Sequence, residues 1–504
     1  MQAYDAIVIG AGHNGLVAAA YLARAGQRVL VLEQAERVGG AAVTLEVWPG
    51  WRVSAASYVC SLLHPRIIAE LDLGRHGYHA YAKDPTSFTP LADGRSLLLG
   101  RDASANTREI GAFEPRDVAG FDAFEREATR LGSSLADAFD AADPSAVHFD
   151  EATNATLHAS AAELVERFVR TPVLQATLAT DGVIGTGAGP RDPGTGYVLA
   201  HHYAGRALGS QGVWGYVRGG MGSISQALAA AAREAGAEIR CDAAVVRILV
   251  RDARACGVVA AGGVEIGAGA VLSNADPVRT FGALLAPDDR PAELSARLAA
   301  WRCEGVSLKL NLALGELPDF SARPGTAAQP HHRATIHVAP SLDYLQSAFE
   351  DALREGSSPA PMLECFIQTP TDPDLAPPGK HLLSIFAQYF PYRRSDGAWD
   401  AAKRAAAADS IVATLARYAP NLPNAIEARQ ILAPPDLERE FGLSGGHIFH
   451  GELLPGQILG ERFAAQTPLA RLYLCGSGAF PGGCVSGIPG LRAAAALLAA
   501  GANV

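Results

Sequence analysis

The sequence is poor in features that mark several other classes of protein. Its seven cysteines stand singly in a chain of 504 residues, and no Cys-x-x-Cys pair occurs. This spacing argues against a disulfide-reductase redox pair and against a zinc site, and it favours a reducing compartment. We therefore assign no metal ligand.

Long apolar runs and basic clusters are also missing. No apolar run reaches the length of about 18 residues that a bilayer span needs. An apolar strand pattern starts near residue 4, which leaves no room for a signal peptide. The formal net charge of −10, without any basic run, argues against a nucleic-acid partner. We expect a soluble, cytoplasmic protein for which peripheral membrane contact is an open alternative.

The first residues carry the clearest positive pattern. Residues 4–9 form a β-branched run that ends at glycine, which is typical of a buried parallel strand. Gly10 permits a tight turn, Gly12 lets the backbone approach a pyrophosphate, and Gly15 lets the following helix pack closely. The helix expected over 16–25 directs unpaired N–H groups at that loop, so the pattern predicts a diphosphate site.

A second strand is expected over 28–32, and it ends at Glu33. A carboxylate at this position can accept both hydroxyls of a ribose, and it repels a 2′-phosphate. The order and spacing of the strand, the glycines, the helix and the acid predict an adenine dinucleotide site of the Rossmann type. The alternative is a glycine-rich loop that serves packing alone.

A second glycine step follows at Arg37–Ala42. Glycines at 39 and 40 bring the backbone close to a neighbour, which we expect to be the remaining half of the dinucleotide. The small residues at 53–57 then suit a flat ring lying against the backbone. An ordinary loop is the alternative for this segment.

The middle of the chain divides into two kinds of segment. Residues 71–215 read as helical segments with charged faces, such as 121–142 and 161–179. The glycine loop at 185–196 is not a second dinucleotide site, because no strand precedes it and Pro190 interrupts it. A helix at 223–235 and strands at 238–241, 245–250, 255–259 and 270–273 return the chain to the first lobe.

Length and pattern together predict an α/β protein with two lobes. A Rossmann-type dinucleotide-binding domain is expected over 1–70, 216–300 and 465–504. A discontinuous α+β substrate domain is expected over 71–215 and 301–464. It includes a strand at 307–314, in which Lys309 shares a face with Ser307 and Asn311, a further strand at 382–389 and a helix at 400–418.

The C-terminal segment is expected to complete the first lobe. Residues 472–475 read as a buried strand, and a glycine turn and the loop 481–487 follow it. That loop opens a final helix, and 491–500 is too short to span a bilayer, so we expect it to pack on the sheet. The N-terminus of this helix can stabilise negative charge on a bound group.

These motifs resemble the phytoene-desaturase-like branch of the flavoprotein amine oxidase superfamily. The resemblance covers nearly the whole chain, and it is strongest at both ends. Gly12–Leu16, Gly219–Gly222, Gly446–Gly451 and Gly476–Gly490 are similar to carotenoid ketolases and to mitochondrial pyridine-nucleotide-disulfide-oxidoreductase-domain proteins. Two stretches depart from the family pattern: Phe480–Cys484 replaces His-Pro-Gly-Gly-Gly, and Ser477 stands where an acid is common.

The resemblance implies FAD as the resident cofactor. It places the ADP half at the first glycines and Glu33, and the pyrophosphate and ribityl chain beside the second glycine step. It places the adenine against the backbone of Val245, and the pyrimidine edge of the flavin at 485–488. The cofactor-binding residues assigned on this basis are Gly10, Gly12, Gly15, Glu33, Gln34, Arg37, Gly39, Gly40, Ala41, Ser57, Val245, Gly476, Ser477, Val485, Ser486 and Ile488.

The same resemblance selects the candidate catalytic residues. The strand of Lys309 is similar to the one that brings a lysine to a water on flavin N5 in amine oxidases. His450 with Glu452 is the second candidate, because a histidine near a flavin can move protons at neutral pH. His201 and His202 are weaker candidates. A surface lysine and structurally hydrogen-bonded histidines are the alternatives, and Cys484 is either a buried thiol or a covalent flavin attachment.

The implied function is that of an FAD-dependent oxidoreductase. We expect dehydrogenation, desaturation or redox-assisted isomerisation of a largely apolar organic substrate by hydride transfer to N5, with electrons leaving to oxygen, a quinone or another carrier. The first alternative is an amine or amino-acid oxidase, for which Arg393 and Arg394 near Tyr389 and Tyr392 are candidates. The second is an FAD-binding protein with a mainly interaction role, which predicts a pocket closed to small molecules.

Overall fold

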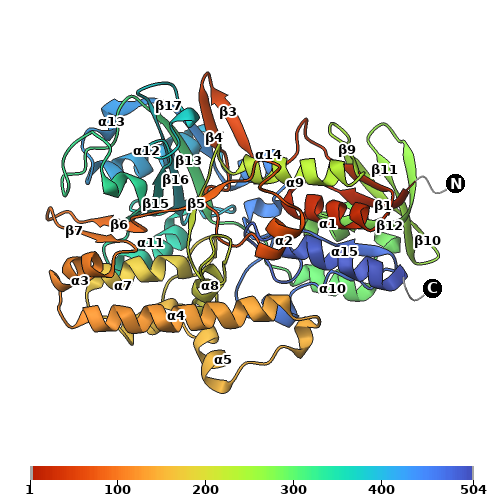
Figure 1. Ribbon diagram of the computed structural model, residues 1–504, viewed down its shortest axis with the longest axis horizontal. Helices are drawn as coiled ribbons and strands as arrows, with labels where there is room; N and C mark the ends of the chain where they lie inside the picture. The colour runs from red at the N-terminus through yellow and green to blue at the C-terminus, as the bar shows by residue number, and fades with distance from the viewer. Residues whose placement is uncertain (1–3, 502–504) are drawn as a thin grey trace.

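Two seven-stranded sheets organise residues 4–501, the part of the chain that the computed structural model describes. In Figure 1 the first sheet lies at the right, near both ends of the chain, and the second lies at the upper left. The strands of the first sheet are β1 (Tyr4–Ile9), β2 (Val29–Leu32), β9 (Glu238–Arg240), β10 (Val245–Arg251), β11 (Arg254–Ala260), β12 (Glu265–Ser273) and β18 (Leu472–Leu474).

The first sheet is parallel where it bears the glycine loop. Strand β1 pairs in parallel with β2 on one side and with β12 on the other, and β9 and β18 extend these pairs. Strands β10 and β11 add an antiparallel extension. A buried parallel sheet needs apolar residues on both faces, and β1 and β2 supply them.

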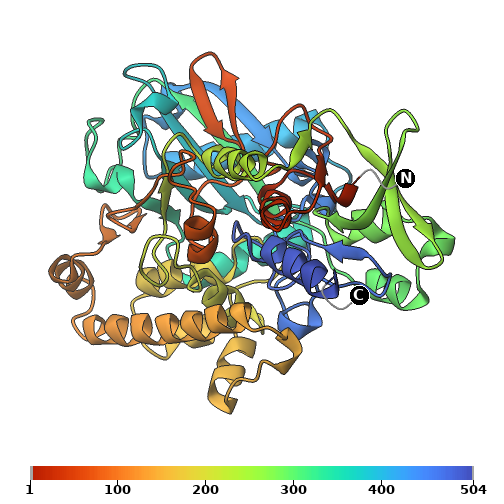
Figure 2. The same cartoon turned by 45° about the vertical axis from the view of Figure 1, so that its right-hand side comes forward.

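Three helices cover one face of this sheet: α1 (His13–Arg24), α9 (Gly222–Glu234) and α15 (Ile488–Gly501). Figure 2 shows them side by side. Helices α1 and α15 meet at Gly490, where a Cβ would lie 2.0 Å from the carbonyl oxygen of Asn14. The expected C-terminal helix therefore packs on α1 and brings the two ends of the chain together. The shorter α2 (Pro65–Glu70) and α10 (Ala292–Ala299) complete this lobe.

The second sheet is mixed, with order β17-β13-β16-β15-β14-β6-β7. Its strands are β6 (Ser87–Pro90), β7 (Ser96–Leu99), β13 (Ser307–Leu314), β14 (Thr335–Val338), β15 (Met362–Ile367), β16 (His381–Gln388) and β17 (Ile426–Leu432). Strand β13 has the expected bounds. One face packs its leucines and isoleucines beneath α12 (Ala401–Ala416) and α13 (Leu422–Ala425).

A helical layer lies below the second sheet in Figure 1. It consists of α3 (Ala103–Gly111), α4 (Asp117–Asp140), α5 (Glu151–His158), α6 (Ala161–Glu166), α7 (Pro172–Ala179) and α8 (Thr195–His202), and α11 (Leu342–Glu355) and α14 (Pro434–Phe441) lie elsewhere in this lobe. The expectation of a continuous helical segment over 161–179 was wrong. Pro172 starts a new helix, and the Asp117 carboxylate accepts hydrogen bonds from the backbone N–H groups of Arg170 and Thr171 at the break.

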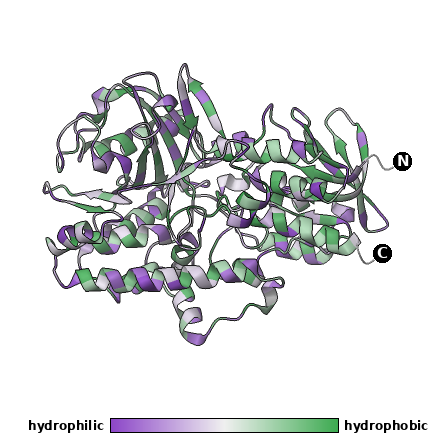
Figure 3. Cartoon of the chain, viewed as in Figure 1, coloured by the Kyte–Doolittle hydropathy of each residue, from purple (hydrophilic) through white to green (hydrophobic). Residues whose placement is uncertain are grey.

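Two small sheets, each of two antiparallel strands, complete the fold. Strands β3 (Thr44–Trp48) and β4 (Trp51–Ser54) pair with each other, and β5 (Ala80–Ala82) pairs with β8 (Gly215–Val217). Figure 3 shows apolar strands inside both lobes and mixed polarity along α4. Among residues 4–501, no helix is long and apolar enough to cross a membrane.

Candidate active site

The glycine loop joins β1 to α1. Gly10 has a φ of 91°, which a side chain rarely adopts. A Cβ at Gly15 would lie 2.3 Å from the carbonyl oxygen of Gly10, and one at Gly12 would lie 2.6 Å from the side-chain nitrogen of Asn274. The loop therefore tolerates no side chain at these positions, so its backbone is bare at the start of α1.

The Glu33 carboxylate faces this loop from the end of β2. Its two oxygens accept hydrogen bonds from the backbone N–H groups of Ala11, at 2.6 Å, and of Ala35, at 2.9 Å. The side chain is buried. The parallel pairing of β1 and β2 thus brings the predicted acid directly against the predicted glycine loop.

The second glycine step lies against the first. The backbone N–H of Gly39 donates to the carbonyl of Ala11 at 2.9 Å, and a Cβ at Gly40 would lie 3.4 Å from the Cα of Gly12. Arg37 and Gln34 are exposed beside this step, and Arg37 pairs with Glu36. The two glycine steps form a single backbone surface.

The C-terminal segment closes this surface from the other side. The Asn14 side chain donates to the Ser477 hydroxyl at 3.0 Å. Asn274, at the end of β12, packs against all three glycines of the first loop, and a Cβ at Gly476 would lie 2.3 Å from its carbonyl oxygen. Sequence reasoning did not single out Asn274, so it missed this central packing position.

A cavity of about 600 Å³ lies between the two lobes. Its walls come from the end of the second glycine step, the helical layer, the second sheet and the C-terminal loop. Six of the predicted site residues line it: Ala41, Ser57, Lys309, His450, Ser477 and Val485. An FAD-binding protein with a mainly interaction role was expected to have a pocket closed to small molecules. The cavity does not fit that expectation.

The other predicted cofactor residues lie outside the cavity wall. The first glycine loop, Glu33 and Gly39–Gly40 form the surface described above. Gly476, Ser486 and Ile488 belong to the C-terminal turn and the start of α15, where the Ser486 hydroxyl accepts from the Ile488 N–H. Val245 begins β10, far along the sheet, and pairs with Ala260.

The floor of the cavity is the polar face of the second sheet. We use the name cavity floor for Lys309, Thr335, His337, Glu364, Phe366 and Phe386. Strand registers align Lys309 with Phe386, Phe386 with Glu364, and Glu364 with His337. Residues of one face alternate with apolar residues of the other, so the strand alternation seen in the sequence delivers polar groups to a buried surface.

Lys309 is 2% exposed. Its ammonium donates to the Ser384 hydroxyl and lies 4.6 Å from the ring centroid of Tyr58. Burial lowers the pKa of Lys309 to about 7. The alternative of a surface lysine is therefore wrong, and this side chain can change its charge near neutral pH.

His450 lines the cavity next to His13, but Glu452 does not. Burial lowers the pKa of His450 to about 4. Glu452 accepts from the Thr186 hydroxyl at 2.7 Å and from the Gly187 N–H at 3.0 Å. Burial opposes its ionisation, but the hydrogen bonds and charge of His447 and these two donors lower its pKa to about 2. Glu452 thus secures the loop at 185–196.

The weaker candidates also differ in whether they line the cavity. His202 lines the cavity, while His201 is fully buried beside Phe139 and burial lowers its pKa to about 3. Cys484 lines the cavity with a φ of 69°, and burial raises the pKa of its thiol to about 12. The thiol form is therefore favoured.

The arginines that supported an amino-acid oxidase lie elsewhere. Arg393 pairs with Glu304 in an exposed position, and Arg394 pairs with Asp396 and stacks on Trp399. Neither lines the cavity. These two arginines therefore do not support the alternative of an amine or amino-acid oxidase.

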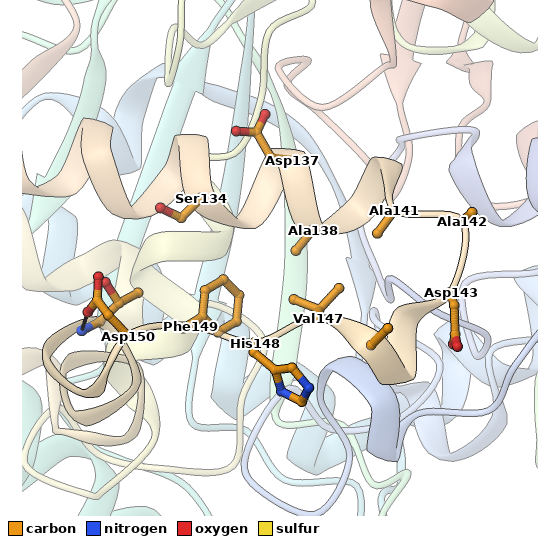
Figure 4. Close-up of a pocket in the computed structure, with 12 residues that line it drawn as sticks. Ser134, Asp137, Ala138, Ala141, Ala142, Asp143, Val147, His148, Phe149 and Asp150 are labelled. Carbon is orange, nitrogen blue, oxygen red and sulfur yellow. Dashed lines mark hydrogen bonds between the residues drawn. The ribbon is translucent and has the colours of Figure 1, made fainter.

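A second hollow, of about 530 Å³, lies at the C-terminal end of α4. Figure 4 shows Val147 and Phe149 below this helix, while Asp137 points away from them. None of the predicted site residues lines this hollow. Among residues 4–501, no cluster of three or more His, Cys, Asp or Glu side chains could hold a metal ion.

Comparison with known proteins identifies the chain. Residues 8–82 match the NAD(P)-binding Rossmann-like domain. The mouse (Mus musculus) pyridine nucleotide-disulfide oxidoreductase domain-containing protein 2 is 40% identical, over 97% of this chain and 92% of the relative. The chain belongs to this protein's family. The lycopene-forming phytoene desaturase of a Paracoccus species is 26% identical, over 98% and 97% of the two chains.

The solved structures agree on the fold. Putrescine oxidase bound to putrescine superposes with a TM-score of 0.62 at 17% identity, over 100% of this chain and 99% of that one. The expected α/β fold is confirmed, and so is the expected relation to the pyridine nucleotide-disulfide oxidoreductase domain-containing proteins and to phytoene desaturases. FAD is the cofactor that the resemblance implies for this chain.

The residues present fit such a group. Three buried side-chain atoms beside the glycine steps have no hydrogen-bond partner among the described residues: His13 Nε2, Asn14 Oδ1 and His450 Nδ1. Buried polar groups are normally paired. A dinucleotide lying on the glycine backbone would complete the site at this place.

Proposed function

We propose that the chain dehydrogenates a largely apolar organic substrate in the cavity between the lobes, by desaturation or a related redox-assisted isomerisation. One observation carries the proposal: His13 at the start of α1, Ala41 and Ala42 at the end of the second glycine step, and the cavity floor all line the same space of about 600 Å³. When bound, FAD supplies a hydride acceptor at N5, for a substrate C–H held about 3.5 Å away. The phytoene desaturase relative supports this class of reaction.

The chain's own residues would hold the cofactor in place and exclude water from it. The ADP half and the diphosphate would be held by Glu33 and by the glycines at 10, 12, 15, 39 and 40. Arg37 and Gln34 would flank these groups, and Val245 would meet the adenine. Ala41, Ser57 and the loop at 485–488 would hold the ring, with Gly476 and Ser477 below it. These roles are supported by the bare backbone of the glycine steps and by the helix N-termini at His13 and Ile488.

Lys309 would stand at the reacting end, where its charge changes near neutral pH. His450 would hold or move a proton through its unpaired Nδ1. Glu452 would act as a positioning residue, through the loop at 185–196. We also propose a cytoplasmic location, with oxygen, a quinone or another carrier as the electron acceptor and with peripheral membrane contact where the substrate is a lipid.

The proposal is tested by anaerobic titration of the FAD-loaded protein with polyenes, acyl lipids and amines. We expect a polyene or an acyl lipid to bleach the flavin, with a product two hydrogens lighter by mass spectrometry. Free FAD with the same compounds is the control. Bleaching by amines alone, or by no compound of the panel, would contradict the proposal.

A further inference from the structure

Two buried lysines line the cavity without an acidic partner. The chain contains four lysines, and two of them, Lys83 and Lys309, face this space. The other two are paired near the surface, Lys380 with Glu427 and Lys403 with Asp396. Among residues 4–501, no carboxylate lies within ion-pair distance of either cavity lysine.

Lys83 has no part in the proposed chemistry described above. Its ammonium donates to the Thr335 hydroxyl and lies 5.2 Å from the ring centroid of Phe366, and the residue is 6% exposed. Burying a charge without an opposite charge is costly. Burial lowers the pKa of Lys83 to about 8, against the attraction of Glu364 and Asp181, so most of it is charged at neutral pH.

The two nearest acids are unequal. Glu364 is engaged: its Oε1 lies 3.1 Å from His337 Nε2, and its Oε2 accepts from the Tyr58 hydroxyl at 3.4 Å. Asp181 faces the cavity, and burial raises the pKa of its carboxyl group above the usual range. Neither carboxylate forms an ion pair with Lys83, whose ammonium faces the cavity.

An aromatic pair connects the two lysines. The rings of Tyr58 and Phe366 lie 4.5 Å apart, with Lys309 over the first and Lys83 over the second. A ligand whose reacting carbon is held near Lys309 would therefore cross these two rings before it reaches Lys83. The rings of Tyr58 and Phe366 favour contact with an apolar part of the ligand, and Lys83 favours an anionic group at its far end.

We propose that Lys83 binds a carboxylate of the substrate, so that the substrate is an organic acid whose apolar body lies on Tyr58 and Phe366. This inference rests on the proposed function, and it narrows the substrate class. An amine in place of the acid would meet the repulsion of Lys83, and a hydrocarbon would leave this lysine unpaired.

The test measures binding without turnover. Calorimetry of the FAD-loaded protein compares decanoic acid, methyl decanoate, 1-decanol and decylamine, which share one chain length. We expect the acid to bind roughly tenfold more tightly than the ester. Lys83→Met abolishes this preference and leaves ester binding unchanged, Lys83→Arg retains part of it, and Lys380→Met is the matched control that keeps it. Flavin absorbance and thermal melting verify that each variant is folded.

Equal binding of acid and ester in the wild type, a preference that survives Lys83→Met, or no binding of any probe overturns the proposal. Tightest binding of decylamine, lost in Asp181→Asn, also overturns it and assigns the site to an amine. Anaerobic bleaching separates the two claims. Acid binding that depends on Lys83, without bleaching by any acid, contradicts the proposed function alone. Bleaching by hydrocarbons or esters that is indifferent to Lys83→Met contradicts the carboxylate site alone.

Discussion

The two sheets of this protein use their faces in opposite ways. The first sheet is apolar on both: Ala6 and Val8 of β1 join one core, and Ile7 and Ile9 join the other. The second sheet is apolar on one face, and its other face carries the polar residues of the cavity floor. The first lobe therefore presents backbone at strand ends, and the second presents side chains from the body of its strands.

This difference separates two kinds of binding. The backbone of a glycine loop suits a group that is the same in all relatives, such as a dinucleotide, because backbone N–H groups do not change with the sequence. Side chains on a sheet face can be exchanged singly, so they suit a substrate that differs among relatives. Four substitutions test this comparison.

Arg462 joins the two regions, and its loss should have the largest effect. Its buried guanidinium donates to the backbone carbonyls of Phe449, Gly451, Glu452, Gln457 and Ser477. We expect Arg462→Met to lower the free energy of unfolding by about 3 kcal/mol, since several buried carbonyls lose their donor. Urea unfolding measures this, and Arg66→Met, which removes an exposed pair with Glu70, should cost under about 1 kcal/mol. Equal costs would contradict the bridging role.

Gly15→Ala should act on the first lobe alone. The new Cβ would lie 2.3 Å from the carbonyl oxygen of Gly10, so the start of α1 must shift. We expect FAD binding to weaken roughly a hundredfold, about 2.8 kcal/mol. Gly74→Ala is the matched control, because a Cβ there meets nothing within 4 Å. Retention of full FAD occupancy by Gly15→Ala would count against the glycine surface.

Glu33→Gln should have a smaller effect on the same lobe. It removes the charge and leaves one oxygen to serve the N–H groups of Ala11 and Ala35. We expect FAD affinity to fall roughly tenfold, about 1.4 kcal/mol, as measured by fluorescence titration of the apoprotein. Unchanged affinity would show that Glu33 shapes the loop without contributing to binding.

Lys309→Met changes the second lobe, and it should raise the free energy of unfolding. The folded-state pKa of Lys309, about 7, lies below its ordinary value of 10.5, so protonation opposes folding. We expect the variant to gain about 1 kcal/mol of unfolding free energy at or below pH 7, and this gain should fade between pH 7 and 10.5. Urea midpoints at pH 6, 8 and 10 measure it, with Lys403→Met as the control. A loss of stability at pH 6 would indicate that the polar floor serves the fold.

The same contrast explains what the sequence could predict. The glycine loop, α1 and Glu33 follow one another within thirty residues, so local pattern sufficed to place them. Strand β13 was also predicted with its bounds, because its alternation is strict. In both cases, the residues that act together are close in sequence.

Residues that meet only through tertiary pairing could not be predicted. Lys83 reaches the cavity because β6 pairs with β14, some 250 positions later in the chain. Glu364 and His337 come together through the register of β14 and β15. Asn274 lies against the glycines because β12 pairs in parallel with β1. No local pattern encodes such registers.

The most direct test of the account is the visible absorption spectrum of the purified wild-type protein, with FAD released by denaturation and counted against protein. The account predicts the two bands of oxidised flavin and one FAD per chain, either as isolated or after reconstitution. A colourless protein that cannot be reconstituted with FAD would contradict the assignment of the glycine surface, and with it the role given to the cavity.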